Sequence, residues 1–288
     1  MSRTVLVTGA AGLIGRAVVD LLRRNDVRVT ALDRTGDVAG ADRVVVGDAT
    51  DPVAVRAALS GADGVVHLAA IPAPVLGTAV DVYAGNSRAT FVVLDAAAEA
   101  GVRRAVIASS YSILGLAWGP DTLRPAYVPV DEASPLQVAD PYALSKQADE
   151  ATAAMMHRRY GMTVTALRFP YVGDVADRLP KRAAELAADP AVGRAELWSY
   201  LDVRDAAAAC WAGLTAAPPG SHPLFVAAPD TLAPYPTRAL LDAYLPDVPR
   251  RAEFPGRTVP IDVSAARRVL GWRARHPWPL ESRDLEAP

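Results

Sequence analysis

The chain has 288 residues, 51% of them hydrophobic, which is enough for one large domain or two smaller ones with a substantial core. A formal net charge of -2 excludes the strong single-sign field typical of proteins that bind nucleic acids or anionic membranes. The single cysteine, Cys210, excludes an internal disulfide and indicates a reducing compartment.

No apolar run reaches the roughly 18 residues of a transmembrane helix. The chain passes from MSRT directly into strand-like VLVTG, which is unlike a signal peptide. We therefore expect a cytoplasmic protein that has no membrane partner and no nucleic-acid partner.

Strand and helix patterns alternate through the first half of the chain. Short, Val-rich runs predict strands at 4–9, 27–33, 42–48, 63–70, 103–110 and 162–169. These runs lack period-two alternation, which is typical of parallel strands buried on both faces. Helices are predicted between them at 13–24, 52–60, 86–100 and 141–160. This order predicts an α/β fold, a doubly wound parallel sheet with helices on both faces.

The pattern changes after Arg168. The following residues are predicted as loop with one short helical piece, KRAAELAA. A helix at 203–215, a strand at 223–227 and helices near 236–245 and 263–270 come next. We expect a main domain of 1–170, to which 201–228 return, and a small lobe of 171–200 and 229–288.

Three glycines at a three-residue spacing, Gly9, Gly12 and Gly15, lie where the first strand meets the first helix. Glycine weakens a strand or helix by roughly 0.5–1 kcal/mol relative to alanine, so bare backbone must be needed there. A helix N-terminus presents free N–H groups and a positive dipole end, and absent side chains let a pyrophosphate approach. The spacing predicts a dinucleotide site, with a tightly packed turn as the alternative.

Two acidic strand ends extend this predicted site. Asp33 lies 18 residues beyond Gly15, where a carboxylate accepts hydrogen bonds from an adenosine ribose and repels a 2′-phosphate. This favours NAD over NADP, although Arg34 could pair with that phosphate. Asp48 and Ala49 end the third strand and could meet the adenine edge, with a solvated strand end as the alternative.

A second group of residues indicates acid–base chemistry. Tyr142 and Lys146 stand four residues apart in PYALSK and so share a helix face, while Ser109 and Ser110 end the fifth strand. A phenol normally ionises at about pH 10, but an adjacent ammonium favours the phenolate. Tyr142 could then act as a general acid/base, with a serine hydroxyl on the same substrate oxygen. The alternative is a tyrosine and a lysine on a solvated helix face.

Together these residues resemble the extended short-chain dehydrogenases/reductases, the NAD-dependent epimerase/dehydratase family, over nearly the whole chain. TGAAGLIG resembles the family's glycine motif, HLAA its segment after the fourth strand, SSYSILG its serine segment and PYALSK its Tyr–Lys helix. YLDVRD and SAARRVLGW resemble later family motifs in the same order. The resemblance implies a Rossmann-type doubly wound parallel sheet with a small C-terminal substrate-binding lobe.

The resemblance also implies hydride transfer between the nicotinamide of NAD and a substrate carbinol carbon. It assigns proton transfer to Tyr142, control of the phenol pKa to Lys146, orientation of the substrate oxygen to Ser110 and a relay water to Asn86. Ser110 is chosen because it lies five residues before Gly115. No metal ligand is expected, and the implied cofactor-binding residues are Gly9, Ala11, Gly12, Leu13, Ile14, Gly15, Asp33, Arg34, Asp48, Ala49, Leu68, Ala69, Ala70, Asn86, Tyr142, Lys146, Phe169, Pro170, Tyr171 and Val172.

The expected substrate lobe departs from the family pattern. Only 36 residues separate Arg168 and Asp205, where nucleotide-sugar enzymes usually carry a long insertion around the nucleotide diphosphate. The short layout resembles the uronate dehydrogenases, which oxidise a free sugar acid, although the 115–135 loop and the C-terminus are longer here. Tyr111, Trp118, Tyr127 and Trp198 could form an apolar lid or pack in the core, and Arg178, Lys181 and Arg194 could bind a carboxylate or be solvated surface charges.

Three functions are therefore open. The first is an NAD(P)-dependent oxidoreductase acting on a small sugar or sugar-acid-like substrate. The second is a nucleotide-sugar 4-epimerase or dehydratase that recycles NAD internally, and the third is a cofactor-sensing protein without catalysis. The helices that bear Asn86 and Tyr142 are Ala-rich, which suits the four-helix dimer interface of many relatives or interior packing. We expect a homodimer.

Overall fold

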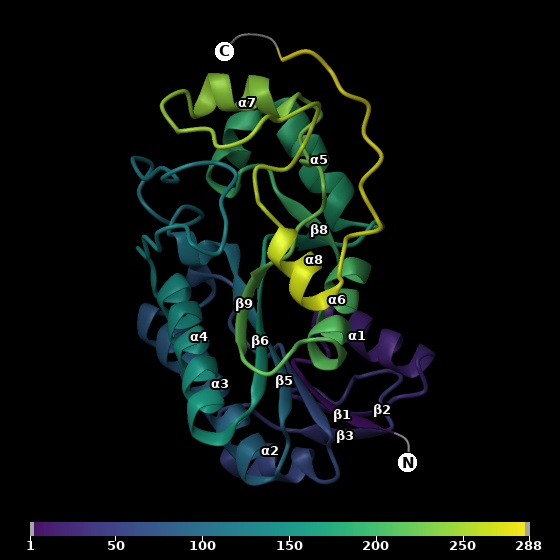
Figure 1. Cartoon of the computed structure of the whole chain (residues 1–288). Coiled ribbons are helices and arrows are strands. Elements are labelled where there is room, and N and C mark those ends of the chain that lie inside the picture. Colours follow the sequence, from purple (N-terminus) through teal and green to yellow (C-terminus); the bar gives the residue numbers. More distant parts are fainter. Residues whose placement is uncertain (1–2, 286–288) are drawn as a thin grey trace.

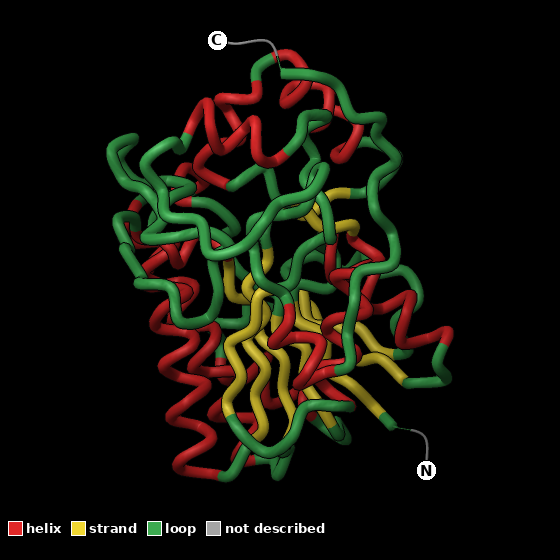
Figure 2. The backbone as a smooth tube through the Cα atoms, turned by 45° about the horizontal axis from the view of Figure 1, so that its top comes forward, coloured by secondary structure: helices red, strands yellow, loops and turns green. Residues whose placement is uncertain are grey.

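Seven parallel strands form the central sheet (Figures 1 and 2). The computed structural model describes residues 3–285 and orders the strands β3-β2-β1-β4-β5-β6-β9. Every neighbouring pair is parallel, which confirms the predicted doubly wound α/β fold. The strands are β1 (Thr4–Thr8), β2 (Arg28–Asp33), β3 (Arg43–Val46), β4 (Gly64–His67), β5 (Arg104–Ser110), β6 (Thr163–Phe169) and β9 (Ser221–Phe225).

Helices cover both faces of this sheet and appear at its two sides in Figure 1. One face is covered by α2 (Pro52–Leu59), α3 (Ala79–Glu99) and α4 (Pro141–Tyr160). The opposite face is covered by α1 (Leu13–Arg24), α6 (Val203–Thr215) and α8 (Ser264–Leu270). Each helix buries an apolar stripe, so the central strands are apolar on both faces.

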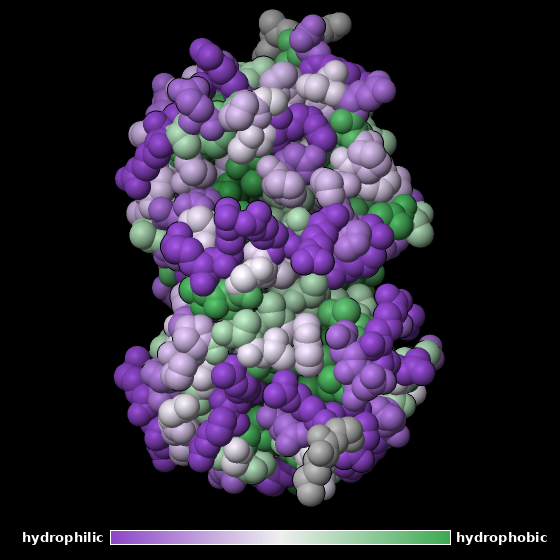
Figure 3. Space-filling model, turned by 45° about the vertical axis from the view of Figure 1, so that its right-hand side comes forward, coloured by the Kyte–Doolittle hydropathy of each residue, from purple (hydrophilic) through white to green (hydrophobic). Residues whose placement is uncertain are grey.

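A third apolar cluster lies beyond the carboxyl ends of the strands, in the upper part of Figure 1. It joins α5 (Arg178–Ala188), α7 (Thr237–Tyr244) and the short 3-10 helix η2 (Tyr111–Leu114). A separate parallel pair, β7 (Tyr171–Gly173) and β8 (Tyr200–Asp202), lies between this cluster and the main sheet. Figure 3 shows a waist between the two parts, where apolar and weakly polar residues gather.

The segment after α8 runs along the molecule without regular structure (Figure 1). Ala266 and Leu270 of α8 are buried in the apolar cluster that also holds side chains of α1 and α6, so they contribute to the core of the main sheet. Asp205 holds the next stretch by accepting hydrogen bonds from the backbone N–H groups of Arg275 and His276, at 2.9 and 2.8 Å. The C-terminal segment is therefore fastened to the strand–helix junction at α6.

Several features differ from the elements predicted from the sequence. The helix predicted at 86–100 begins at Ala79, about two turns earlier, and the Thr78 hydroxyl caps it by accepting the Asp81 N–H. The last strand ends at Phe225 rather than at residue 227. The β7–β8 pair was not predicted, since each strand is only three residues long.

Parallel alignment brings the predicted site segments to one edge of the sheet. Thr8 is in register with His67, and Ser110 with Phe169. The glycine turn, the HLAA segment, the serine segment and the residues after β6 all follow carboxyl ends of strands. In open α/β sheets, ligands bind in the crevice outside these ends.

In residues 3–285, no helix combines the length and the apolar character needed to cross a membrane. Within the same range, no three His, Cys, Asp or Glu side chains are grouped so that they could hold a metal ion. Cys210 is fully buried, and burial raises the pKa of its thiol to about 12.

The ion pair between Arg168 of β6 and Glu150 of α4 ties the sheet to this helix. The guanidinium donates to both carboxylate oxygens, at 2.9 and 2.8 Å, and the two side chains are 3% and 13% exposed. Removing the carboxylate leaves a buried charge without its partner. We expect Glu150→Ala to lower the free energy of unfolding by about 3 kcal/mol, measured by urea denaturation.

The matched control for this prediction is Glu185→Ala, which removes the exposed partner of Arg182. Surface ion pairs contribute little, so we expect a loss below about 1 kcal/mol. Equal losses in the two variants would contradict the prediction for Glu150.

Candidate functional site

The turn between β1 and α1 is closed by backbone contacts that only glycine permits. Gly9 has a left-handed φ of +65°, and a Cβ there would lie 2.7 Å from the amide nitrogen of Ala69 and 2.8 Å from the carbonyl carbon of Leu68. A Cβ on Gly15 would overlap the Gly9 carbonyl oxygen. These glycines let the segment after β4 and the first turn of α1 each approach the turn closely, and they leave the turn bare.

The N-terminus of α1 meets this turn without a capping side chain. Gly12 is the N-cap residue, no side chain bonds the exposed N–H groups, and the first turn contains no acidic residue. The N–H groups of Leu13, Ile14 and Gly15 therefore lack intrahelical acceptors. Such a helix end attracts a phosphate through its N–H groups and its dipole.

Asp33 is fixed beside the same turn. Its Oδ2 accepts the Ala11 N–H at 2.9 Å, and its Oδ1 accepts the Thr35 N–H at 3.2 Å. The carboxylate thus lies where β2 ends and the glycine turn passes, which is the position expected for a ribose contact. Arg34 is exposed at the start of the following loop.

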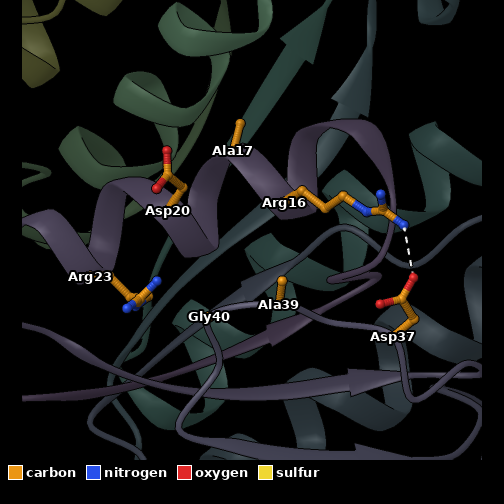
Figure 4. A pocket seen from close by; sticks show the side chains of 7 residues that line it. All are labelled: Arg16, Ala17, Asp20, Arg23, Asp37, Ala39 and Gly40. Carbon is orange, nitrogen blue, oxygen red and sulfur yellow. Dashed lines mark ion pairs between the residues drawn. The ribbon is translucent and has the colours of Figure 1, made fainter.

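A surface hollow of about 440 Å³ lies beside α1 (Figure 4). Arg16 of α1 points toward Asp37 of the facing loop, and their closest nitrogen and oxygen are 3.9 Å apart. Neither Tyr142 nor Lys146 borders the hollow, so it is not the candidate catalytic centre. The lining residues are Arg16, Ala17, Asp20, Arg23, Asp37, Ala39 and Gly40.

Asp48 and Ala49 follow β3 at the same edge. The Asp48 carboxylate accepts the backbone N–H and the hydroxyl of Thr50, each at 2.8 Å. The backbone bond from Thr50 is the main cause that lowers the pKa of Asp48. Ala49 is buried against α2 and α3. The carboxylate orders the loop before α2, and its predicted contact with adenine stays a prediction.

Tyr142 and Lys146 lie on one buried face of α4. The Lys146 side chain is 4% exposed, and its ammonium lies 5.6 Å from the centre of the Tyr142 ring. Asp140 caps the helix by accepting the Ala143 N–H at 2.9 Å, and Pro141 occupies the first turn. The helix therefore begins just before the phenol and fixes its spacing from the ammonium.

Asp149 keeps the Lys146 ammonium charged in this buried position. Burial is the largest single influence and lowers the pKa of Lys146, but Asp149, 3.1 Å from Nζ, together with Tyr142 and Glu150 outweighs it, so the pKa is raised. Asp149 was not identified from the sequence. The signal that could have revealed it is an acidic residue three positions after the lysine, on a helix face that packs inward.

The two serines that end β5 have different partners. Ser109 Oγ donates to Glu150 at 2.7 Å, on the side of α4. Ser110 Oγ accepts the Ser112 N–H at 3.1 Å, so its own proton remains for another acceptor. Successive strand residues point to opposite faces, which separates the two hydroxyls. This geometry favours Ser110 as the hydroxyl that meets a substrate.

Asn86 is buried on α3 and bonds the segment that follows β4. Its Oδ1 accepts the Ile71 N–H at 2.8 Å, and its Nδ2 donates to the Ile71 carbonyl at 3.1 Å and to Ser145 Oγ at 3.2 Å. Asn86 therefore joins this segment to α3 and α4. A relay water on Asn86 stays a prediction.

The remaining predicted cofactor segments lie at the same strand edge. The N–H groups of Leu68 and Ala69 donate to Thr8 Oγ1 at 3.2 and 3.3 Å, which holds the HLAA segment against the glycine turn. Phe169 ends β6 beside Ser110, and Pro170, Tyr171 and Val172 lead from it into β7.

The aromatic residues considered for a lid pack in the core. Trp198 is 1% exposed and donates Nε1–H to the Pro190 carbonyl at 2.6 Å. Tyr111 is buried and donates to the Ala195 carbonyl at 3.1 Å. Tyr127 is buried as well, whereas Trp118 is exposed. Of the two alternatives, core packing holds for Tyr111, Tyr127 and Trp198.

The three cations considered for carboxylate binding differ in their partners. Lys181 and Arg194 each pair with an aspartate. Arg178 instead lies over the ring of Tyr171, 5.2 Å from its centre. Tyr171 belongs to the segment that follows β6. Arg178 therefore lies close to the strand edge described above.

The bare turn and the buried phenol–ammonium pair define a dinucleotide-dependent α/β enzyme. Residues 5–226 match the model of the NAD dependent epimerase/dehydratase family, which spans the central sheet from β1 to β9. The chain belongs to this family, so it is an NAD-dependent enzyme of the short-chain dehydrogenase/reductase type. The resemblance inferred from the motifs is confirmed.

Individual relatives cover different shares of the chain. NAD-dependent glucose-6-phosphate dehydrogenase of Haloferax volcanii is 28% identical over 70% of this chain and 78% of that protein. A Streptomyces 3-diazoavenalumate denitrifying reductase is 32% identical over 94% of this chain and 88% of that protein. Uronate dehydrogenase of Pseudomonas syringae is 28% identical, but the match spans only 58% of its length.

The fold is also similar to solved structures. A short-chain dehydrogenase/reductase superfamily protein from Agrobacterium tumefaciens with bound NAD superposes with a TM-score of 0.71 at 28% identity, covering 96% of this chain and 93% of that one. The residues of the present chain fit NAD: its glycine turn has no room for a Cβ at Gly9, and the adjacent helix N-terminus carries no cap.

Gly9→Ala tests whether the turn needs bare backbone. The variant forces alanine into a left-handed φ and places its Cβ against Ala69. We expect a lower melting temperature and at least tenfold weaker NAD binding, measured by calorimetry and by titration of protein fluorescence.

The matched control is Gly61→Ala, since Gly61 has a φ of +75° but no atom within 4 Å of the added Cβ. This variant isolates the conformational cost, about 1 kcal/mol, and leaves NAD affinity unchanged. NAD binding of the Gly9 variant at the original affinity would contradict the prediction.

Proposed function

We propose that this enzyme transfers a hydride between NAD and a hydroxyl or carbonyl carbon of a small sugar or sugar acid. The observation that carries the proposal is the buried pair of Tyr142 and Lys146 at the strand edge that also bears the bare glycine turn. NAD, when bound, supplies or accepts the hydride, and the protein supplies binding and proton transfer.

Three side chains take part in the proton transfer. In the oxidative direction the Tyr142 phenolate accepts the proton of the substrate hydroxyl, and the Lys146 charge stabilises that phenolate. The Ser110 hydroxyl donates to the same substrate oxygen and holds it in place. In the reductive direction the Tyr142 phenol returns the proton to the carbonyl oxygen.

The bare helix end supports the cofactor assignments. We propose that the N–H groups at Gly12–Gly15 hold the pyrophosphate and that Asp33 accepts the adenosine ribose hydroxyls. The segments Leu68–Ala70 and Phe169–Val172 would flank the nicotinamide half, because they follow neighbouring strand ends.

The size of the upper part supports a small substrate. The stretch from Arg168 to Asp205 is occupied by β7, α5, a 3-10 helix and β8, and its largest aromatic side chain, Trp198, is buried in the core. We propose that residues 171–200, with parts of 229–288, form the substrate lobe. Arg178 on Tyr171 is the cation placed to bind a sugar carboxylate or phosphate.

A 4-epimerase or dehydratase reaction on a nucleotide sugar is the second candidate, because the family includes both chemistries. Such an enzyme returns the hydride to the same substrate and forms no net NADH. A protein that only senses the cofactor would do neither, and the buried Tyr142–Lys146 pair argues against it.

We further propose a cytoplasmic homodimer. Val80, Tyr83 and Phe91 of α3 and Leu144 of α4 expose apolar side chains on the two neighbouring helices. A second copy could cover this surface through its own α3 and α4.

The main test uses Tyr142→Phe. We expect the enzyme to form NADH, read by its absorbance, with at least one member of a panel of aldoses, sugar phosphates and uronic acids. Loss of the phenol hydroxyl should lower kcat by about 100-fold or more, while NAD affinity stays within twofold. Tyr160→Phe, at the far end of the same helix, is the control and should keep full activity.

Substrate turnover by the Tyr142→Phe variant at the original rate would contradict the proposed mechanism. Interconversion of nucleotide sugars without net NADH would favour the epimerase instead.

Asp33→Asn tests the cofactor preference. The amide oxygen can still accept the Ala11 N–H, but the charge that repels a 2′-phosphate is gone. We expect the ratio of kcat/KM for NADP to that for NAD to rise about tenfold or more. The control is Asp37→Asn in the same loop, which should leave the ratio unchanged; an unchanged ratio in Asp33→Asn would contradict the assignment.

A further inference from the structure

The carboxylate of Asp149 lies in the buried space behind the Tyr142–Lys146 pair. Its side chain is 1% exposed, and Oδ2 is 3.1 Å from the Lys146 ammonium. The other oxygen, Oδ1, is buried without a hydrogen-bond partner among residues 3–285. Two opposite charges in such a dry space are stable only as a pair, since removal of either one leaves the other uncompensated.

A chain of hydrogen bonds leads from the glycine turn to Thr90, beside this carboxylate. Thr8 Oγ1 contacts His67 Nδ1 at 2.7 Å, and His67 Nε2 contacts Thr90 Oγ1 at 3.2 Å. Burial raises the pKa of Asp149, whereas the Lys146 charge and the neighbouring Thr90 hydroxyl act to lower it. The chain joins β1, β4 and α3 inside the core and ends next to Asp149 of α4.

The direction of the protons in this chain follows from what each oxygen already accepts. Thr8 Oγ1 accepts the N–H groups of Leu68 and Ala69, so its own proton goes to His67 Nδ1. His67 is then the tautomer that donates from Nε2 to Thr90. The Thr90 hydroxyl accepts from His67 and still has its own proton beside the Asp149 carboxylate.

The charged groups around Asp149 come from two elements. On α4 these are Lys146, Glu150 and, beside the lysine, Tyr142; on β4 the titratable group is His67. His67 is neutral, because burial and the Lys146 charge lower its pKa to about 3. Lys146 is thus the cation that balances Asp149, and Asp149 is the anion in contact with Lys146.

We propose that Asp149 is a positioning residue for the reaction: it holds the Lys146 ammonium charged and beside Tyr142, and the Thr8–His67–Thr90 chain ends next to it. This role rests on the proposed acid–base function of Tyr142.

Loss of the Asp149 charge has two opposing effects on the phenol. The missing negative charge by itself favours the phenolate, whereas deprotonation of a buried, unpaired Lys146 disfavours it. The Lys146 ammonium lies 5.6 Å from the centre of the Tyr142 ring, whereas Asp149 stands seven residues, about two helix turns, from Tyr142, so the lysine dominates. In Asp149→Asn, Lys146 should lose its proton more easily, and Tyr142 should ionise at higher pH.

The chain contains only two lysines, Lys146 and Lys181, which makes a direct test practical. Protein labelled with 13Cε-lysine gives one NMR signal for each, assigned with Lys181→Arg. In Asp149→Asn we expect the Lys146 titration to move down by at least about 1 pH unit and to fall below that of Lys181. The exposed Lys181, paired with Asp177, serves as the internal reference in every spectrum.

A second titration follows the phenol with 13Cζ-tyrosine label, the Tyr142 signal being assigned with Tyr142→Phe. We expect its titration to move to higher pH in Asp149→Asn and, by a smaller amount, in Thr90→Val, which removes the hydroxyl beside Asp149. Asp149→Glu should recover part of the shift. Asp95→Asn, a carboxylate change on α3 away from this chain, should leave both titrations unchanged.

An unchanged Lys146 titration in a folded Asp149→Asn variant, verified by circular dichroism, would overturn the proposal. So would a Tyr142 titration that stays in place or moves to lower pH. Neither titration needs a substrate or bound NAD, so failure of the sugar panel would reject the proposed function and leave this result standing.

Discussion

All seven strands of the main sheet run in one direction, and this parallel alignment determines where the candidate site lies. A parallel sheet buried under helices on both faces has its free backbone groups and loops only at the strand ends. The carboxyl ends of β1, β2, β4, β5 and β6 therefore gather the glycine turn, Asp33, the HLAA segment and the serine segment at one edge. Residues far apart in the chain meet there because their strands are neighbours.

Two features at this edge are unfavourable for the stability of the fold. At Gly9 the end of β4 approaches so closely that no Cβ fits, and the helix N-terminus beside it is left uncapped. At Lys146 an ammonium is buried where burial disfavours it, and Asp149 compensates. Both features lower stability in isolation, and both are what the proposed dinucleotide site and the proposed acid–base role of Tyr142 require.

The upper part of the molecule builds a core of its own. Its aromatic residues contribute to this core, as the burial of Trp198 and Tyr111 shows. Arg178 of α5 lies over the ring of Tyr171 of β7, and this position supports its proposed contact with a substrate carboxylate or phosphate.

The sequence by itself determined the alternating α/β fold, the glycine turn and the shared helix face of Tyr142 and Lys146, because each depends on periodicity or on residues close in the chain. It misplaced the start of α3, which depends on a single cap at Thr78. It also missed Asp149, whose importance lies in its buried contact with Lys146 rather than in any motif. Tertiary structure decided that burial, as it decided the β7–β8 pair and the different partners of Ser109 and Ser110, because burial and partners arise only when distant segments pack together.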